Sequence, residues 1–196
     1  MNQILLSDAL ALIGILSGCG EWDATQDQKL NALVQLLSKE YSDEKVLIFT
    51  QFADTANYLG KNLAARGITK LATVTGDSSD PTKIAYYFSP ASNKKKIGSQ
   101  EELRVLVATD VLSEGQNLQD CRIIVNYDLP WAIIRLIQRA GRVDRIGQQA
   151  EEILCYSFLP ADGVEQLITL RGSLQQRMRE NAEVVGTDEA FYEGDS

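Results

Sequence analysis

The sequence predicts an α/β domain in which helices cover both faces of a mostly parallel sheet of about six strands. Two observations predict this fold class. Short, nearly continuous apolar runs recur along the chain, and such runs are typical of strands buried on both faces. Between them, apolar residues recur at helical spacing, and strands that alternate with helices imply βαβ units with right-handed crossovers. A length of 196 residues, with 44% hydrophobic and 23% charged residues, fits one globular domain with a substantial core.

Five segments have the strand pattern. The run KVLIFTQF at residues 45–52 is the clearest, because it follows a Ser-Asp turn and is almost continuously apolar. The other four lie at residues 68–75, 104–109 (RVLVAT), 122–127 (RIIVNY) and 153–158 (ILCYSF).

The predicted helices lie between and around these strands. Leucine and valine recur at helical spacing over residues 30–37, and Asp27 can cap the start of that helix. A second helix is predicted over residues 56–63 and is expected to end near Gly67, a natural C-terminal stop. Two further helices are predicted over residues 131–140 and 164–182.

The apolar run over residues 4–16 is interpreted as a packed N-terminal helix. It has the length of a signal-peptide core, but no basic segment precedes it and Asp8 interrupts it. No stretch approaches the roughly 18 apolar residues that a membrane span needs, so no membrane partner is expected.

We expect a helical extension packing on the core at residues 1–42, the main domain at 43–160 with an irregular insertion near 77–102, and a C-terminal helix and acidic tail at 161–196.

Composition excludes several kinds of site. The chain has no histidine, and Cys19, Cys121 and Cys155 are far apart, so neither a zinc cluster nor Ser-His-Asp or Cys-His catalysis is expected. The cysteines are interpreted as reduced, buried thiols of a cytoplasmic protein. The net charge of −8 argues against binding nucleic acid by bulk charge, but residues 135–145 hold four arginines and one acid.

Ligands of a parallel sheet bind beyond the carboxyl ends of its strands, so the loops after residues 52, 75, 109 and 127 are candidate sites. The strongest local signal is the string QRAGRVDR at residues 138–145. Gln138 and Arg142 lie four residues apart and share a helix face, and Arg145 can point the same way if a turn follows. Several guanidinium groups aimed at one point suit a polyanion such as a triphosphate; a solvated face or a salt-bridge network is the structural alternative.

This string resembles motif VI of superfamily-two helicases, the QRxGRxGR pattern, with Asp144 where the second glycine usually stands. The string continues to residue 148, so that residues 145–148 read RIGQ, and this ending resembles a hallmark of Swi/Snf-type translocases. The resemblance implies that Arg142 and Arg145 are arginine fingers, which stabilise the charge developing during γ-phosphoryl transfer and are worth about 10³–10⁵ in rate. It implies that Gln138 contacts the γ-phosphate or the attacking water. Asp144 lies between the two arginines and is expected near the nucleotide. Its carboxylate can hold the two guanidinium groups in place or weaken the positive field around them, and we favour the holding role.

The string ATDVLSEGQNL at residues 108–118 combines a strand end, a polar turn and a glycine. Backbone N–H groups and a threonine hydroxyl at such a place suit a phosphate, and an ordinary βα loop is the alternative. The string resembles helicase motif V. That resemblance implies that Thr109 contacts the nucleic-acid backbone, that Gly115 allows close approach, and that Asn117 meets the nucleotide ribose.

Three weaker matches surround these motifs. The string IFTQF at residues 48–52 resembles motif IV, which implies that Thr50 and Gln51 approach the nucleic-acid backbone. Thr75 and Gly76 resemble the short turn after the next strand, which also meets a phosphate. The string YDLPW at residues 127–131 resembles the D-x-P-W lead-in to motif VI of Swi/Snf-type proteins. All the matches occur in the family's order and imply a RecA-like helicase C-terminal domain.

No GxxxxGK[ST], DEAD or DExH string occurs in the sequence. In the family that the chain resembles, those strings hold ATP and Mg²⁺ and belong to the first RecA-like domain. The resemblance therefore implies a composite ATPase site, which a first RecA-like domain of the same longer protein, or a partner, completes. The chain by itself is expected to hydrolyse no ATP.

The resemblance thus implies the second lobe of an ATP-dependent translocase that grips a nucleic-acid backbone, and its Swi/Snf-type strings imply double-stranded DNA as the polymer. One rival is a DExH-type RNA helicase lobe, which the RIGQ string and the D-x-P-W lead-in argue against. Another is a non-catalytic RecA-like interaction module, which the intact arginine pair argues against. A P-loop enzyme such as a kinase is disfavoured because the phosphate loop is missing.

Overall fold

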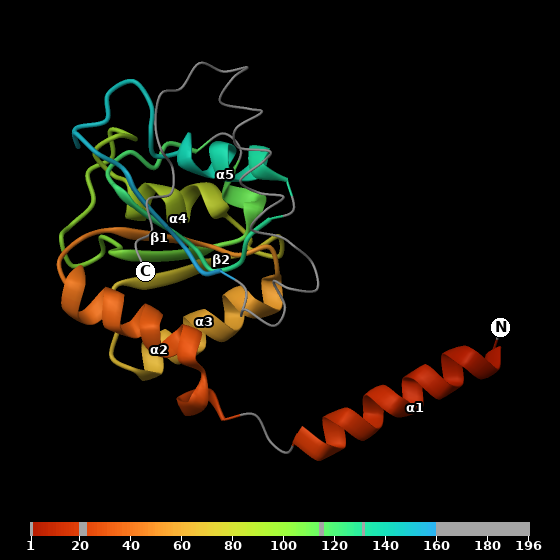
Figure 1. Cartoon of the computed structure of the whole chain (residues 1–196). Helices are drawn as coiled ribbons and strands as arrows, with labels where there is room; N and C mark the ends of the chain where they lie inside the picture. Colours follow the sequence, from red (N-terminus) through yellow and green to blue (C-terminus); the bar gives the residue numbers. More distant parts are fainter. Residues whose placement is uncertain (1, 20–22, 114–115, 131, 160–196) are drawn as a thin grey trace.

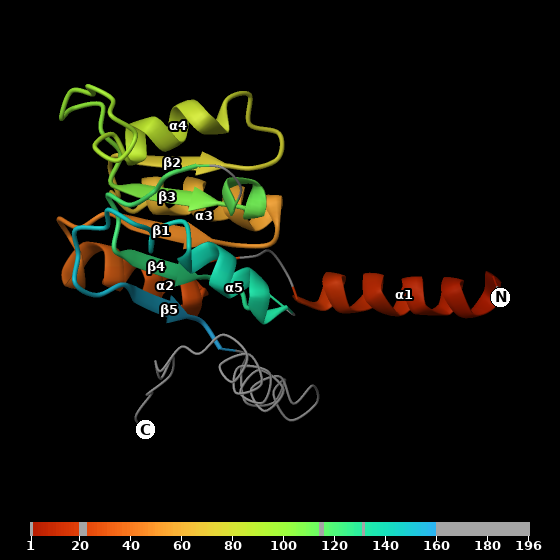
Figure 2. The same cartoon turned by 90° about the horizontal axis from the view of Figure 1, so that it is seen from above.

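The computed structural model describes residues 2–19, 23–113, 116–130 and 132–159. Its described part contains one sheet of five parallel strands in the order β2-β3-β1-β4-β5 (Figure 2). Each strand lies within one of the segments predicted from the sequence, so the α/β fold class is confirmed, with five strands where about six were expected. The strands are β1 (Val46–Phe49), β2 (Leu71–Val74), β3 (Val105–Ala108), β4 (Ile123–Asn126) and β5 (Leu154–Ser157).

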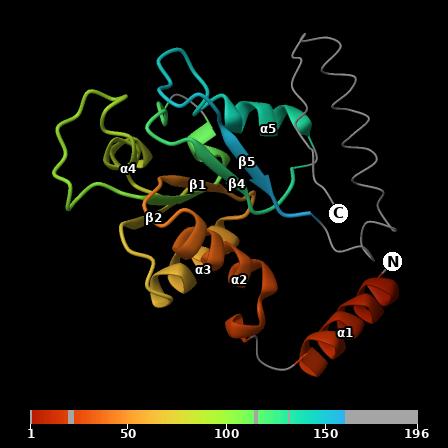
Figure 3. The ribbon, with the colours of Figure 1, turned by 60° about the vertical axis from the view of Figure 1, so that its left-hand side comes forward.

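Helices cover both faces of the sheet (Figures 1 and 3). One face carries α2 (Gln28–Gln35), its π-helical continuation (Leu36–Glu40) and α3 (Ala53–Ala65). The opposite face carries α4 (Pro81–Phe88) and α5 (Ile133–Ala140). Two short 3-10 helices lie at Ala24–Gln26 and at Asp110–Ser113, the latter named η3.

Strand β1 shows why the strand segments are apolar at nearly every position. Successive side chains of a strand point to opposite faces, and here both faces are covered. Val46 and Ile48 pack into the core beneath α2 and α3, whereas Leu47 and Phe49 pack into the core beneath α4 and α5. All four side chains are fully buried. Burial of each stabilises the fold by about 1.5–3 kcal/mol relative to an exposed position.

Capping residues set the starts of two helices. The Asp27 carboxylate accepts a hydrogen bond from the Leu30 N–H at 3.0 Å, as the sequence predicted for α2. Helix α4 begins in the same way, with the Asp80 carboxylate accepting from the Lys83 N–H at 2.8 Å and a proline in the first turn. The first part of the region expected to be irregular, near residues 77–102, is therefore helical. The Asp-Pro pair was the local signal for this helix.

The N-terminal helix α1 (Asn2–Cys19) lies apart from the sheet (Figures 1 and 2). Its described leucine and isoleucine side chains are more than half exposed, so the packing on the core expected for residues 1–42 is present for α2 and not for α1. In the described ranges, no helix combines the length and the apolar character that a membrane crossing requires. The helix expected over residues 164–182 lies outside the described residues, and the domain boundaries at 42 and 160 stay predictions.

Candidate nucleotide and nucleic-acid interface

The carboxyl ends of the parallel strands gather the predicted site residues along one edge of the sheet. The strand order places the end of β3 between the ends of β2 and β1. The Thr109 N–H donates to the Val74 carbonyl, and the Thr50 N–H donates to the Ala108 carbonyl, each at 3.0 Å. Thr75, Thr109 and Thr50, which are far apart in the sequence, therefore follow neighbouring strand ends. This edge is the place where α/β sheets bind ligands.

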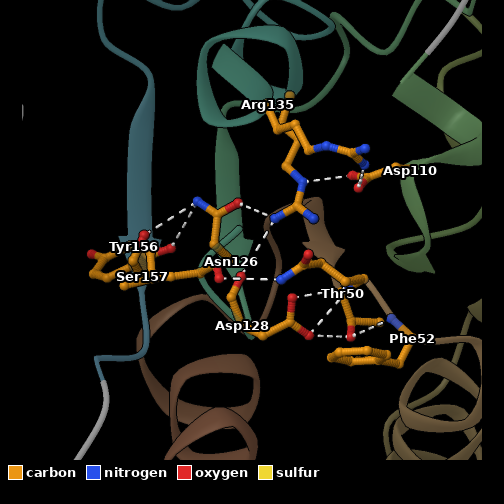
Figure 4. Close-up of polar contacts among 11 residues, drawn as sticks. Thr50, Phe52, Asp110, Asn126, Asp128, Arg135, Tyr156 and Ser157 are labelled. Atoms are coloured by element: carbon orange, nitrogen blue, oxygen red, sulfur yellow. Dashed lines mark hydrogen bonds and ion pairs between the residues drawn. The ribbon is translucent and has the colours of Figure 1, made fainter. Parts of the chain in front are cut away.

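Asp128 organises the loop that follows β1. Its carboxylate accepts hydrogen bonds from the Thr50 hydroxyl and from the Gln51 N–H, the latter at 2.9 Å (Figure 4). The Gln51 side chain donates to the Leu129 carbonyl at 3.1 Å. Thr50 is fully buried, and its hydroxyl also accepts from the Phe52 N–H at 3.3 Å. The Thr50 hydroxyl is thus used within the protein, and the predicted approach of Thr50 to the nucleic-acid backbone stays a prediction.

The other predicted backbone contacts are accessible to different degrees. Thr75 is only 5% exposed, and its N–H donates to the Ser78 hydroxyl at 2.9 Å within a tight turn. Gly76 is exposed, and a Cβ added there would meet no atom within 4 Å. Thr109 is 8% exposed but lines the cavity described next. Gly76 and Thr109 are therefore better placed than Thr75 for a contact with an external phosphate.

A cavity of about 550 Å³ opens at this edge of the sheet. It lies between the loop after β1, the loop after β3 and the start of α5. Its volume is in the range of ligand sites. Its lining mixes amide, hydroxyl, carboxylate, guanidinium and apolar groups, and consists of Gln51, Phe52, Thr109, Asp110, Val111, Ala132 and Arg135.

Two arginines of α5 converge on the carboxylate of Asp110, the first residue of η3. Arg135 donates to one carboxylate oxygen at 2.8 Å (Figure 4), and Arg139 donates to the other at 2.8 Å. Arg139 is fully buried and also donates to the Asn126 side-chain oxygen at 3.0 Å and to the Asp128 carbonyl at 3.5 Å. Its guanidinium lies 5.2 Å from the centre of the Phe49 ring. These contacts join α5 to the ends of three strands.

Sequence reasoning did not single out this network. Arg139 and Asp110 stood within the two strongest strings, but neither was assigned a role. Arg135 was counted only in the local charge, and Asp128 only as part of the lead-in to motif VI. The sequence did contain a signal for this salt bridge, because Asp110 directly follows Thr109 in one motif and Arg139 directly follows Gln138 in the other.

The segment carrying the predicted arginine fingers is a turn that directly follows α5. The helix ends at Ala140, and Arg142 lies past its end rather than on a continuing helix face. The Arg142 carbonyl accepts from the Leu118 N–H at 3.2 Å. The Gln119 side chain donates to the Arg145 carbonyl at 2.8 Å and to the Ile146 carbonyl at 3.0 Å. The backbone of the finger segment is therefore held by the loop that follows η3.

The string RIGQ contributes a second anchor for the same turn. The Gln148 side chain donates to the Cys121 carbonyl and to the Val143 carbonyl, each at 3.1 Å. Gly147 has φ of +104°, a conformation that favours glycine. Gln138 and Arg145 are exposed and Arg142 is half-buried. The fixed backbone with accessible side chains fits a group of donors that reaches toward a ligand outside this domain.

The remaining predicted nucleotide residues differ in what the structure shows. Asn117 donates to the Ser92 carbonyl at 3.2 Å, and its carbonyl oxygen Oδ1 is buried without a hydrogen-bond partner in the described residues. Gly115 lies outside the described residues. Asp144 is exposed, and its charge adds to the effect of burial in raising the pKa of the Cys155 thiol to about 11. Its predicted role in holding the fingers stays a prediction.

Buried groups near the sheet have shifted protonation equilibria. Burial raises the pKa of the Cys121 thiol to about 12, and this fully buried side chain donates to the Ile123 carbonyl at 3.1 Å. Burial also lowers the pKa of Lys29, which donates to the Tyr127 carbonyl at 2.5 Å. Cys121 and Cys155 are free thiols. The interpretation as reduced thiols fits both, with Cys155 less deeply buried.

Residues 28–147 match the helicase conserved C-terminal domain. The chain belongs to this family. The matched range contains the helicase-like strings at residues 48–52, 75–76, 108–118 and 127–131, and the string at 138–148 except its last residue. It also contains strands β1 to β4. The chain is thus the second RecA-like lobe of a superfamily-two helicase, as the sequence predicted.

Curated relatives of this helicase C-terminal domain come from several branches. The chain is 35% identical over 144 residues to the uncharacterised ATP-dependent helicase YqhH of Bacillus subtilis, covering 74% of the chain and 24% of that protein. It is 32% identical over 169 residues to the RNA polymerase-associated protein RapA of Vibrio parahaemolyticus, covering 85% and 16%. It is 28% identical over 151 residues to the DEAD-box ATP-dependent RNA helicase 14 of Arabidopsis thaliana, covering 77% and 23%. The chain spans about a quarter or less of each.

Solved structures show the same fold. The C-terminal part of the Fun30 ATPase domain superposes with a TM-score of 0.61 at 20% identity, covering 86% of this chain and 53% of that one. A DEAD box protein from the hyperthermophile Methanococcus jannaschii superposes with a TM-score of 0.56 at 23% identity, covering 76% and 38%. Both likenesses confirm the RecA-like arrangement of a helicase C-terminal domain.

Proposed function

We propose that this helicase C-terminal lobe belongs to a Swi/Snf-type ATP-dependent translocase and supplies Arg142 and Arg145 to a composite ATPase site. The observation that carries the proposal is the anchored finger segment after α5. Its backbone is fixed by Gln119 and Gln148, while Arg145 remains exposed. A fixed backbone limits the rearrangement needed when the guanidinium groups meet the phosphates of ATP.

The chemistry of the donors fits a triphosphate held mainly elsewhere. Arginine forks match phosphate oxygens in geometry and charge, and Gln138 adds a neutral donor that can orient a water. ATP bound with Mg²⁺ supplies the γ-phosphoryl group, and in this proposal a first RecA-like domain holds both. The residues of this lobe close over the nucleotide from the other side of the cleft. Their charge stabilises the transition state for phosphoryl transfer more than the bound ground state.

The edge formed by the ends of β1, β2 and β3 is the proposed grip on nucleic acid. Gly76, Thr109 and Gln51 are the predicted residues that reach the surface or the cavity there. Contacts of this kind address phosphates and are largely independent of base sequence. Closure of the cleft around ATP would then move this grip relative to that of the first lobe, which steps the protein along the polymer.

The test is nucleic-acid-stimulated ATP hydrolysis by a longer protein that joins this lobe to its first RecA-like domain. We expect Arg142→Ala and Arg145→Ala each to lower kcat by about 10³-fold or more, with the affinity for ATP little changed. Arg122→Ala is the matched control, because Arg122 is ion-paired with Glu44 at the opposite edge of the sheet. Unchanged turnover in both finger variants would instead favour a non-catalytic interaction module.

Double-stranded DNA is the proposed polymer, because the RIGQ and D-x-P-W strings are those of Swi/Snf-type proteins. A second candidate is an RNA helicase lobe. The RNA helicase candidate is favoured by the similarity of this chain to DEAD-box ATP-dependent RNA helicase 14 of Arabidopsis thaliana. Stimulation of the same ATPase by duplex DNA and by RNA separates the two. Strong stimulation by RNA alone, or robust strand separation, would replace the translocase proposal with the second candidate.

A further inference from the structure

Arg135 and Phe52 face the same cavity but come from different elements. Arg135 lies in the first turn of α5, and Phe52 lies in the loop between β1 and α3 (Figure 4). Both side chains are accessible: that of Arg135 is 53% exposed, and Phe52 is 60% exposed. The resemblance to helicase motifs assigns neither residue a role. The cavity therefore combines a cation and an aromatic ring beside two predicted nucleic-acid contacts, Gln51 and Thr109.

The charges at this cavity are not balanced. The Asp110 carboxylate faces two guanidinium groups, those of Arg135 and Arg139. The nearby carboxylate of Asp128 is used by the Thr50 hydroxyl and the Gln51 N–H. The ammonium group of Lys29 interacts with the carboxylates of both Asp128 and Asp27. Because Arg139 alone offsets the charge of Asp110, the guanidinium of Arg135 is an excess positive charge at the cavity mouth, although the whole chain has a net charge of −8. An anion is the ligand that this charge favours.

Arg135 is the arginine that can exchange partners. If Arg139 left Asp110, a fully buried guanidinium would lose its ionic partner, which is strongly unfavourable. If Arg135 left, Asp110 would keep its contact with Arg139, and the half-exposed Arg135 would stay solvated. An ion pair with a half-exposed partner is weak, so a phosphate can displace the carboxylate at small cost.

We propose that Arg135 and Phe52 form a subsite for one sugar–phosphate unit of a nucleic-acid strand. The guanidinium of Arg135 turns from Asp110 to a phosphate oxygen, and the ring of Phe52 packs on the adjoining sugar. Phosphate and sugar alternate along the strand, so a cation and an apolar ring on one cavity match two successive parts of its backbone. The subsite rests on the proposed function, because it extends the grip formed by Gln51 and Thr109.

The experiment measures binding of a fluorescein-labelled DNA duplex of about 20 base pairs to the 196-residue chain by anisotropy over a series of salt concentrations. We expect Arg135→Ala to weaken binding about tenfold and to reduce the slope of log K against log salt by about one. We expect Phe52→Ala to weaken binding about threefold and to leave that slope unchanged. An RNA strand of the same length serves as a second arm, and an equal dependence on both residues supports the same subsite.

Arg122→Ala is the control, because it removes one positive charge from the other edge of the sheet. Equal weakening by Arg122→Ala and Arg135→Ala would show binding by bulk charge and overturn the subsite. Binding by the unaltered chain that neither Arg135→Ala nor Phe52→Ala weakens would overturn the subsite and leave the proposed function standing. Absence of binding by the unaltered chain at low salt would overturn both. The exposed Phe52 keeps the test decisive if Arg135→Ala impairs folding.

Discussion

At the scale of the residue, Arg139 is the largest side chain that is fully buried in the described structure. A charge in such a place costs several kcal/mol of desolvation unless ionic and hydrogen-bonding partners offset it. Arg139 has Asp110, the Asn126 side chain and the Asp128 carbonyl as partners. This arrangement ties motif VI to motif V, so the segment of the proposed fingers and the strand end that carries Thr109 are joined through the same contacts.

We expect Arg139→Met to lower the free energy of unfolding by about 3 kcal/mol, because the oxygen atoms that accept hydrogen bonds from the guanidinium would lose their cationic donor. Chemical denaturation measured by far-UV circular dichroism checks this. The matched control is Arg122→Met, which breaks a partly exposed ion pair with Glu44 and is expected to cost less than about 1 kcal/mol. Equal losses for the two variants would show that the Arg139 network contributes no more than a surface ion pair.

At the scale of the element, the end of α3 determines where β2 begins. The Ile68 N–H donates to the Leu63 carbonyl and the Gly67 N–H donates to the Ala64 carbonyl, each at 3.1 Å. This pair of bonds is a Schellman motif, which needs a left-handed residue after the helix. Gly67 has φ of +85° and meets that need. Ile68 and Leu63 are both buried, so the chain turns sharply into the sheet.

Replacement of Gly67 by alanine is expected to destabilise the fold by about 1 kcal/mol or more, since a Cβ is disfavoured at this positive φ. The comparison is Gly98→Ala, where φ is ordinary and an added Cβ would approach no atom closer than 3.8 Å. Thermal unfolding of the two variants provides the measurement. A decrease in Tm for Gly98→Ala as large as that for Gly67→Ala would contradict the backbone explanation.

At the scale of the whole molecule, the parallel sheet separates two tasks. The ends of β1, β2 and β3 carry the proposed grip on nucleic acid, and the turn after α5 carries the proposed fingers. The two are linked through Asp110, which belongs to the loop after β3 and pairs with two residues of α5. These polar contacts join the sheet edge to the helix that directly precedes the finger segment.

The 196-residue chain by itself is expected to release no phosphate from ATP, with or without DNA, because it contains no phosphate-loop or DEAD/DExH string. A phosphate-release assay on the purified chain checks this, with a longer protein that includes the first RecA-like domain as the positive control. Turnover by the isolated chain that Arg142→Ala abolishes would reveal a complete ATPase site within it.

The described strands, the cap at Asp27 and the family can be read from the sequence alone. All five strands of the described residues were located, because a strand buried on both faces must be apolar at successive positions, which is visible along the chain. The cap at Asp27 and the stop near Gly67 depend on neighbouring residues, so local reading was sufficient. Helix α4 was missed because its start signal lay within a stretch otherwise rich in serine, lysine and glycine.

How the site residues are used depends on contacts that form only in the folded chain. The Thr50 hydroxyl is bonded to Asp128, 78 residues away, and Arg139 is paired with Asp110, 29 residues away. The local sequence does not specify such pairs, because they follow from the strand order and from the packing of α5 on the sheet. That geometry buries Thr50, leaves Arg135 at the cavity mouth and fixes the backbone of the segment that carries the proposed arginine fingers. Local patterns report covalent neighbours, whereas a binding surface is made by neighbours in space.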